Sequence, residues 1–129
     1  MKLPPTPRGF TRDTVMVPQV DGGEVCFDGF RYGPLLVHRC WGNRDNWDVM
    51  HIQSSCRVPV IDLDFDGVCF DVACRFAQAM AGAIEWDKIT LRGEKVVGWT
   101  AERNKKADAA RAEFIQSESS RLSTAKVAS

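Results

Sequence analysis

The sequence predicts an α+β fold: a small antiparallel sheet of three to five strands packed against one helix, plus a C-terminal helix. Short β-prone runs separated by turn residues fill the first half of the 129-residue chain. Apolar residues then recur at helical spacing over residues 69–84. A stretch rich in Ala, Lys, Arg and Glu follows at residues 101–116 and favours a second helix. The length suits one domain, which we place at residues 14–116.

The N-terminal part is expected to be an arm followed by two strands. Residues 1–13 are Pro-rich, so we expect a flexible arm. Residues 14–20 form the first predicted strand, and Pro18 favours an edge position for it. Residues 24–27 form the second, which we expect to end at the Asp-Gly pair 28–29.

Residues 35–41 and 47–53 are predicted to form a central β-hairpin, because both runs are β-prone and turn formers separate them. Alternation places Leu35 and Val37 on one face of the first strand, and Val49 and His51 on one face of the second. Both faces of each strand carry apolar residues. One face is therefore expected to pack on the helix, while the other stays partly exposed.

The next segment is predicted to be an amphipathic helix that Asp66 caps and that ends near Trp86. Its apolar face recurs at steps of three and four residues. That face comprises Cys69, Val72, Ala73, Phe76, Met80, Ala83 and Ile84. We expect Cys69 to lie in the core.

The C-terminal part is expected to end in a helix and a tail. Residues 88–99 form either a last hairpin or a strand followed by a helix start. Thr100 is a suitable N-cap for the helix at 101–116, and residues 117–129 are expected to be a disordered tail. The helix has a narrow apolar stripe, so it either projects or pairs with a second copy, which leaves a homodimer open. The stripe comprises Ala107, Ala110, Phe114 and Ile115.

Composition narrows the function classes. The chain holds 17 basic and 17 acidic residues, which argues against nucleic-acid binding by charge alone. Residues 60–87 nevertheless carry six acids against one base, Arg75. We see no apolar run of membrane-spanning length and no secretion signal, so we expect a cytoplasmic protein without membrane contact. Five cysteines in such a chain are expected to stay reduced.

The run Asp62-x-Asp64-x-Asp66-Gly67 matches the first half of an EF-hand calcium loop. The second half does not match, because Ala73 occupies the twelfth position, where a bidentate Glu is required. We therefore interpret the run as a solvated acidic loop and expect no metal site. Binding of a divalent cation by residues 62–66 stays open.

His38, Cys40, His51 and Cys56 are the remaining candidates for chemistry. Across the hairpin, His38 or Cys40 could approach His51, but the spacing matches no standard zinc pattern. A nucleophilic Cys40–His51 pair lacks a local signature. We therefore expect no catalytic residue and no cofactor, and leave open whether the four side chains converge.

Trp41 and Trp47 flank the hairpin turn, close to Arg39 and Arg44. Aromatic and Arg side chains together can stack bases or form a protein-binding hot spot. The alternative is that the two Trp residues pair across the hairpin and cover the end of the sheet.

Strand, turn, strand and helix follow in order, with Leu36-Val37-His38 leading into residues 47–52 and then an Ala-rich helix to Trp86. This order, over about half of the chain, resembles small accessory proteins of plasmids, phages and integrative elements. The resemblance implies a compact, non-enzymatic protein that binds host or defence machinery, as anti-restriction and anti-CRISPR inhibitors do.

We accordingly expect an inhibitor of a host nucleic-acid-processing or defence complex, for example a CRISPR effector, that acts by protein–protein contact. The expected partner-binding residues are Asp62, Asp64, Asp66, Asp71, Trp41, Trp47 and Arg44. The alternative is a small nucleic-acid-binding or regulatory module whose affinity falls steeply with salt. That module would use Arg39, Arg44, Trp41, Trp47, Arg103, Lys105 and Lys106.

Overall fold

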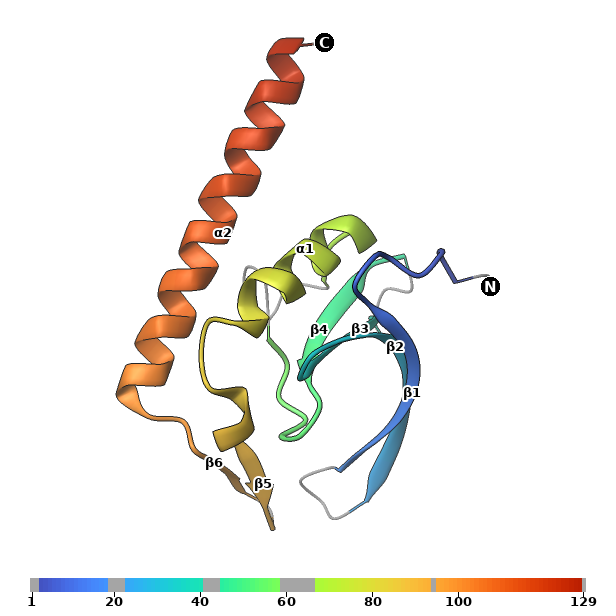
Figure 1. Cartoon of the computed structure of the whole chain (residues 1–129), viewed down its shortest axis with the longest axis vertical. Helices are drawn as coiled ribbons and strands as arrows, with labels where there is room; N and C mark the ends of the chain where they lie inside the picture. Colours follow the sequence, from blue (N-terminus) through green and yellow to red (C-terminus); the bar gives the residue numbers. More distant parts are fainter. Residues whose placement is uncertain (1–2, 19–22, 41–44, 59–66, 94, 129) are drawn as a thin grey trace.

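The computed structural model confirms the α+β class with a C-terminal helix (Figure 1). It describes residues 3–18, 23–40, 45–58, 67–93 and 95–128, without the side chains of 18 and 120–128. The elements are β1 (Thr11–Pro18), β2 (Glu24–Tyr32), β3 (Leu35–Arg39), β4 (Trp47–His51), α1 (Phe70–Ala81), the 3-10 helix η1 (Trp86–Lys88), β5 (Thr90–Arg92), β6 (Lys95–Val97) and α2 (Ala101–Ala128). Strands β1 to β4 form one antiparallel sheet in chain order, and β5 and β6 form a second.

The predicted central hairpin is present, with Leu35 opposite His51. Strands β3 and β4 begin where predicted but end at Arg39 and His51 rather than at residues 41 and 53. The first two strands differ from the prediction. Strand β1 begins at Thr11, inside the expected arm, and Phe10 before it is buried. Strand β2 continues through Gly29, where we expected a turn, because β3 passes very close to it. A side chain at Gly29 would collide with the Val37 carbonyl oxygen, so this glycine permits a close strand pairing.

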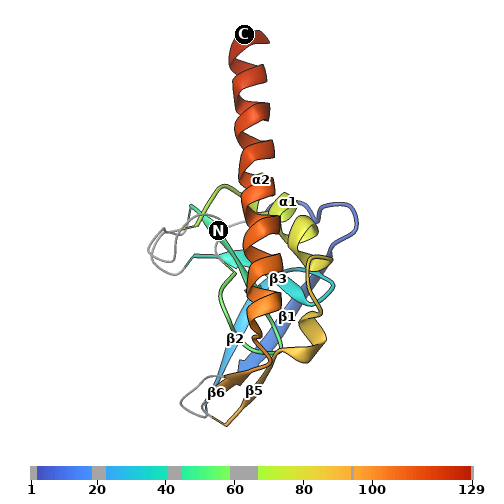
Figure 2. The same cartoon turned by 90° about the vertical axis from the view of Figure 1, so that its left-hand side faces the viewer.

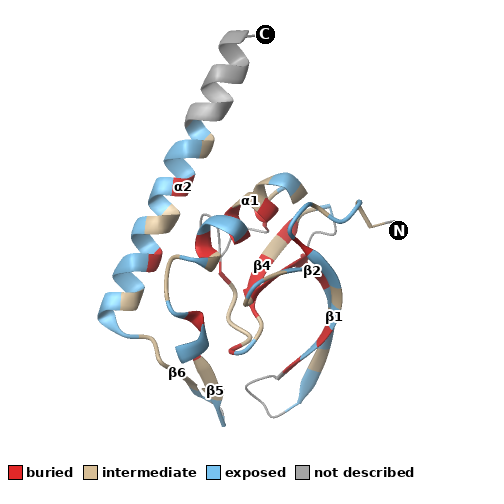
Figure 3. Cartoon of the chain, in the orientation of Figure 1, coloured by how far each residue is buried: buried red, intermediate tan, exposed pale blue. Residues whose placement is uncertain are grey.

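Helix α1 covers one face of the sheet, and the main core lies between them (Figures 1 and 3). Phe30, Leu35 and Val37 of the sheet meet Phe76 and Met80 of the helix, and all five are 0% exposed. The second face is more buried than expected. There the curved β1–β2 ribbon contributes to a smaller cluster of Val15, Val17, Leu36 and Met50.

Helix α1 is shorter at both ends than predicted. Its N-cap is Cys69, an exposed residue, so the expectations of an Asp66 cap and a core Cys69 were wrong. Asp66 itself lies outside the described residues. The helix ends at Ala81 because Gly82, a poor helix former, follows as the C-cap. Trp86 instead begins η1, and its Nε1 donates to the Met80 carbonyl (2.8 Å).

The C-terminal part contains the predicted hairpin alternative, β5–β6, and then α2. Thr100 caps α2 as expected, because its Oγ1 accepts from the main-chain N–H of Arg103 (3.1 Å). The helix first packs on α1 through Ala107 and Phe114, both buried. It then continues past the body of the domain to Ala128 (Figures 1 and 2), whereas the sequence predicted a disordered tail from residue 117.

The two edges of the larger sheet differ. The outer edge of β4 is covered by main-chain hydrogen bonds, which join Trp47 to Val68 and Val49 to Val58. Strand β1 is the other edge, and among the strands that the structure describes its one partner is β2. Charged side chains and Pro18 on β1 discourage pairing with a further strand. Of the helices described, none has the length and apolar character that crossing a membrane requires.

Candidate functional site

The acidic segment, residues 60–87, is described only in part. Asp62, Asp64 and Asp66 of the expected partner-binding set lie outside the described residues, as do Trp41 and Arg44. Asp71 is exposed in the first turn of α1, where the helix dipole stabilises a negative charge. The carboxylate of Asp71 is therefore available to a partner at this end of the helix.

Arg75, the single base of residues 60–87, is bound by a residue outside that segment. Its Nε and Nη2 donate to the two carboxylate oxygens of Glu118 on α2 at 2.7 and 2.9 Å. The side chain of Glu118 is only 15% exposed, and its hydrogen bond is the main cause that raises the pKa of Arg75. The carboxylate of Glu118 thus neutralises the positive charge of Arg75. Arg75 therefore does not offset the negative charge of the acids in residues 60–87.

Replacing Glu118 with Gln is expected to reduce the free energy of unfolding by about 1 kcal/mol, because Arg75 loses a bidentate partner while it keeps access to water. Urea unfolding of Glu118→Gln, Arg75→Met and the double variant would measure the coupling. The exposed Glu102–Lys106 pair, 3.1 Å apart, is the matched control and should couple by less than about 0.5 kcal/mol. Equal coupling in the two pairs would contradict the role given to Glu118.

The four His and Cys candidates do not gather at one site, although the main-chain N–H of His51 donates to the Cys56 carbonyl (2.8 Å). With Leu35 opposite His51, His38 falls opposite Asp48, and the two histidines lie on opposite faces of the sheet. The sequence left open whether His38 approaches His51, and the hairpin register places the two rings apart. In the described part of the chain, no group of three or more His, Cys, Asp or Glu side chains could hold a metal ion.

Each histidine has its own local partners. His38 Nδ1 is hydrogen-bonded to the Arg39 carbonyl (2.9 Å), and its ring packs on Phe27. His51 Nδ1 lies 2.6 Å from Ser54 Oγ. Burial is the main cause that lowers the pKa of both rings, so both are neutral near pH 7. Cys40, the nucleophile considered, is buried beside Gly67.

Trp47 belongs to the core. It is 3% exposed, and its ring centre lies 4.6 Å from that of Phe70 and 6.1 Å from that of Phe30. The guanidinium carbon of Arg39 lies 4.6 Å from the ring centre, in a cation–π contact. This burial leaves little of the Trp47 side chain for a partner, while the expected pairing of Trp47 with Trp41 lies outside the described residues.

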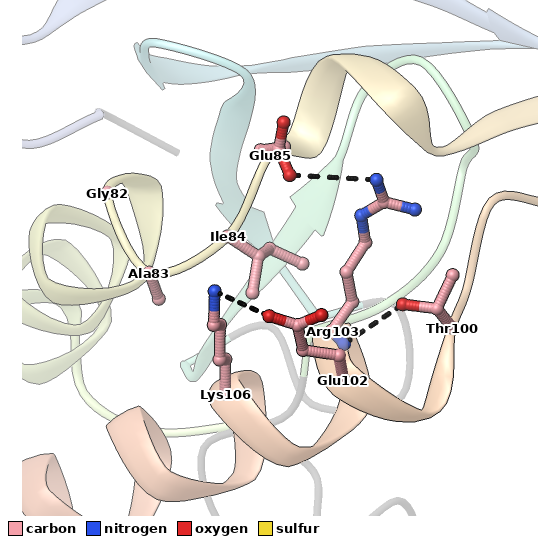
Figure 4. Close-up of a pocket in the computed structure, with 8 residues that line it drawn as sticks. All are labelled: Gly82, Ala83, Ile84, Glu85, Thr100, Glu102, Arg103 and Lys106. Carbon is pink, nitrogen blue, oxygen red and sulfur yellow. Dashed lines mark hydrogen bonds and ion pairs between the residues drawn. The ribbon is translucent and has the colours of Figure 1, made fainter.

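A pocket of about 400 Å³ lies between the end of α1 and the first turns of α2 (Figure 4). Its charged side chains are already paired with one another. Arg103 donates from Nη1 to the Gly98 carbonyl (2.7 Å) and lies 3.6 Å from Glu85, while Lys106 pairs with Glu102. The lining comprises Gly82, Ala83, Ile84, Glu85, Thr100, Glu102, Arg103 and Lys106.

This pocket contains two positions that the nucleic-acid alternative would use, Arg103 and Lys106, and both have acidic partners. Their positive charge is therefore partly compensated, which weakens attraction for a phosphate backbone. Sequence reasoning did not find the pocket, since Glu85 and Arg103 are 18 residues apart in number and belong to different elements. The Thr100 N-cap was the one signal that located the start of α2 beside it.

Comparisons with protein-family models, with curated proteins and with solved structures found no match.

Proposed function

We propose that the protein is a non-enzymatic binding protein of a mobile genetic element, which inhibits a host nucleic-acid-processing or defence complex by direct protein–protein contact in the cytoplasm. A CRISPR effector is one such complex. The observation that carries the proposal is the Arg75–Glu118 pair, because it compensates the only base of the acidic segment from outside.

The acidic segment here means residues 60–87, with Asp62, Asp64, Asp66, Asp71, Glu85 and Asp87. Of the acids in its described part, Asp71, Glu85 and Asp87 are exposed, and only Glu85 has an ion-pair contact, a long one to Arg103. Complexes that process nucleic acids hold their substrate in basic channels. An acidic surface on a compact protein attracts and covers such a channel, so inhibition follows from competition with the phosphate backbone.

Replacing Asp62, Asp64, Asp66 and Asp71 together with Ser is expected to weaken binding to the partner by about a hundredfold or more, because several interfacial charges are lost at once. The measurement is a pull-down of the tagged protein from a bacterial lysate that contains CRISPR and restriction systems, with nuclease treatment of half the sample. Circular dichroism would verify that the variant is folded. A stoichiometric protein partner that survives nuclease and requires the four Asp residues supports the proposal.

A charge-matched control replaces four exposed acids outside the segment with Ser, and it should bind as the unmodified protein does. These are Glu24, Glu102, Asp108 and Glu113. Retained binding by the Asp variant would contradict the inhibitor proposal. Bound material that is lost with nuclease, with a steep dependence on salt, would instead indicate the nucleic-acid-binding module.

A further inference from the structure

His51 is an unusual residue for the interior of this domain. His51 and Ser54 are both 0% exposed, and the Oγ of Ser54 is hydrogen-bonded to the Nδ1 of His51. No described residue forms a hydrogen bond with its other ring nitrogen, Nε2. Buried polar atoms without a partner are rare in folded proteins and destabilise the structure around them.

His51 lies where the four-stranded sheet meets the segment that leads to α2. Its ring centre is 5.0 Å from that of Trp86 in η1, and Trp86 in turn packs edge-on against Trp99 (5.9 Å). Arg103 contacts Glu85, which precedes Trp86, and the carbonyl of Gly98, which precedes Trp99. It therefore connects the residues next to the two Trp side chains. Residues 86–93 and 95–99, here called the junction segment, therefore rest on the sheet partly through the His51 ring.

A protonated His51 fits this site poorly. The imidazolium has an N–H on both ring nitrogens. Among the described residues, Ser54 Oγ lies 2.6 Å from Nδ1, whereas the main chain of Trp86 interacts with the ring without forming a hydrogen bond of good geometry with Nε2. Contact with the Trp86 ring provides some cation–π attraction. Burial lowers the pKa of His51, and the main chain of Trp86 opposes that shift without reversing it.

The surrounding charged groups do not offset this cost. On η1 and just before it, Glu85, Asp87 and Lys88 are exposed. Arg57, after the turn that follows β4, is bound to Asp48. Arg75 and Arg103, on the two helices, are bound to Glu118 and Glu85. Asp71 of α1 is exposed, and Arg39 of β3 lies over Trp47. Burial and the Trp86 main chain are the causes that act on the ring.

We propose that His51 is a pH-sensitive lock between the sheet and the junction segment, and that protonation of its ring in mild acid releases that segment while strands β2 and β3 stay folded. The direction follows from proton linkage. Because the buried ring binds a proton less tightly than an open one, the open state takes up the proton. Opening is therefore favoured as the pH falls below about 6.5, and the effect stops growing at the lower pKa of the buried ring.

Amide hydrogen exchange of the full chain, measured by mass spectrometry between about pH 7.5 and about pH 5, tests the proposal. After correction for the intrinsic exchange rate, the opening constant of residues 86–99 should rise by up to about tenfold per pH unit below about pH 6.5, as expected for one linked proton. Because burial also lowers the pKa of His38, whose ring packs on Phe27 of β2, the protection of β2 and β3 is judged in the His38→Phe variant, where it should change little. Unchanged protection of residues 86–99, or an equal loss in all elements, would overturn the proposal.

His51→Phe keeps an aromatic ring against Trp86 but cannot titrate, so it should abolish the pH response of the junction segment. His38→Phe is the matched control, since His38 is the other buried histidine and lies on the opposite face beside Phe27. It should leave the response intact, and the reverse pattern would refute the lock. If His51→Phe does not fold, nuclear magnetic resonance of the unmodified protein decides. The ring signal of His51 and the indole N–H signal of Trp86 should shift with one midpoint, and separate midpoints would exclude the lock.

Discussion

A Gly98→Ala variant is expected to lose about 2–4 kcal/mol of unfolding free energy, a large part of the stability of a domain of this size. Gly98 has a φ of +101°, which an Ala residue adopts only with strain. A Cβ there would also collide with the Lys88 carbonyl oxygen and lie 3.0 Å from the Ile89 Cα. Both are main-chain atoms, so relief requires η1 to move away from the segment before α2.

Urea unfolding followed by Trp fluorescence and by circular dichroism would measure this loss. Gly93→Ala is the control, because Gly93 also has a positive φ (+63°) but has open space around it. It should cost only about 1 kcal/mol, the strain of a left-handed conformation. If the two variants lose the same stability, the close approach of Gly98 to Lys88 makes no contribution of its own.

The sheet and α1 could be predicted because their apolar periodicities are local. Alternation in residues 35–41 and 47–53 is sufficient to identify β3 and β4, and steps of three and four identify Ala73, Phe76 and Met80. Boundaries depend on contacts that no local pattern contains. The Asp-Gly pair at 28–29 is a common turn, yet β3 approaches Gly29 and extends the strand.

The candidate site was harder to predict because its contacts join distant residues. Arg75 and Glu118 are 43 residues apart, and Glu118 lay in the segment expected to be disordered. The separation of the histidines follows from the register of one hairpin. Once Leu35 is known to face His51, His38 must lie on the other side of the sheet. The chain alone left that register open, since a loop of this length allows more than one turn type.

The main core rests on Phe76, so Phe76→Ala should destabilise the domain by about 3–5 kcal/mol. The side chain is 0% exposed and lies between the sheet and α2, with its ring centre 5.1 Å from that of Phe114 in an edge-on contact. Removing the ring leaves a cavity that α1 cannot close, because Ala73 and Ala77 on the same face are too small to fill it. Urea unfolding should show a single transition at lower denaturant concentration.

Phe114→Ala tests whether the contact between Phe76 and Phe114 holds α2 against α1. Phe114 is 9% exposed, and it and Ala107 are the buried residues among the α2 side chains that the structure describes. Its removal should therefore release α2 from α1 while the sheet keeps its fold. We expect a smaller loss, about 2–3 kcal/mol, with faster amide exchange confined to α2. The double variant should show a coupling of about 0.5–1.5 kcal/mol from the ring contact. Additive losses would mean that α2 is held by Arg75 and Glu118 rather than by the aromatic pair.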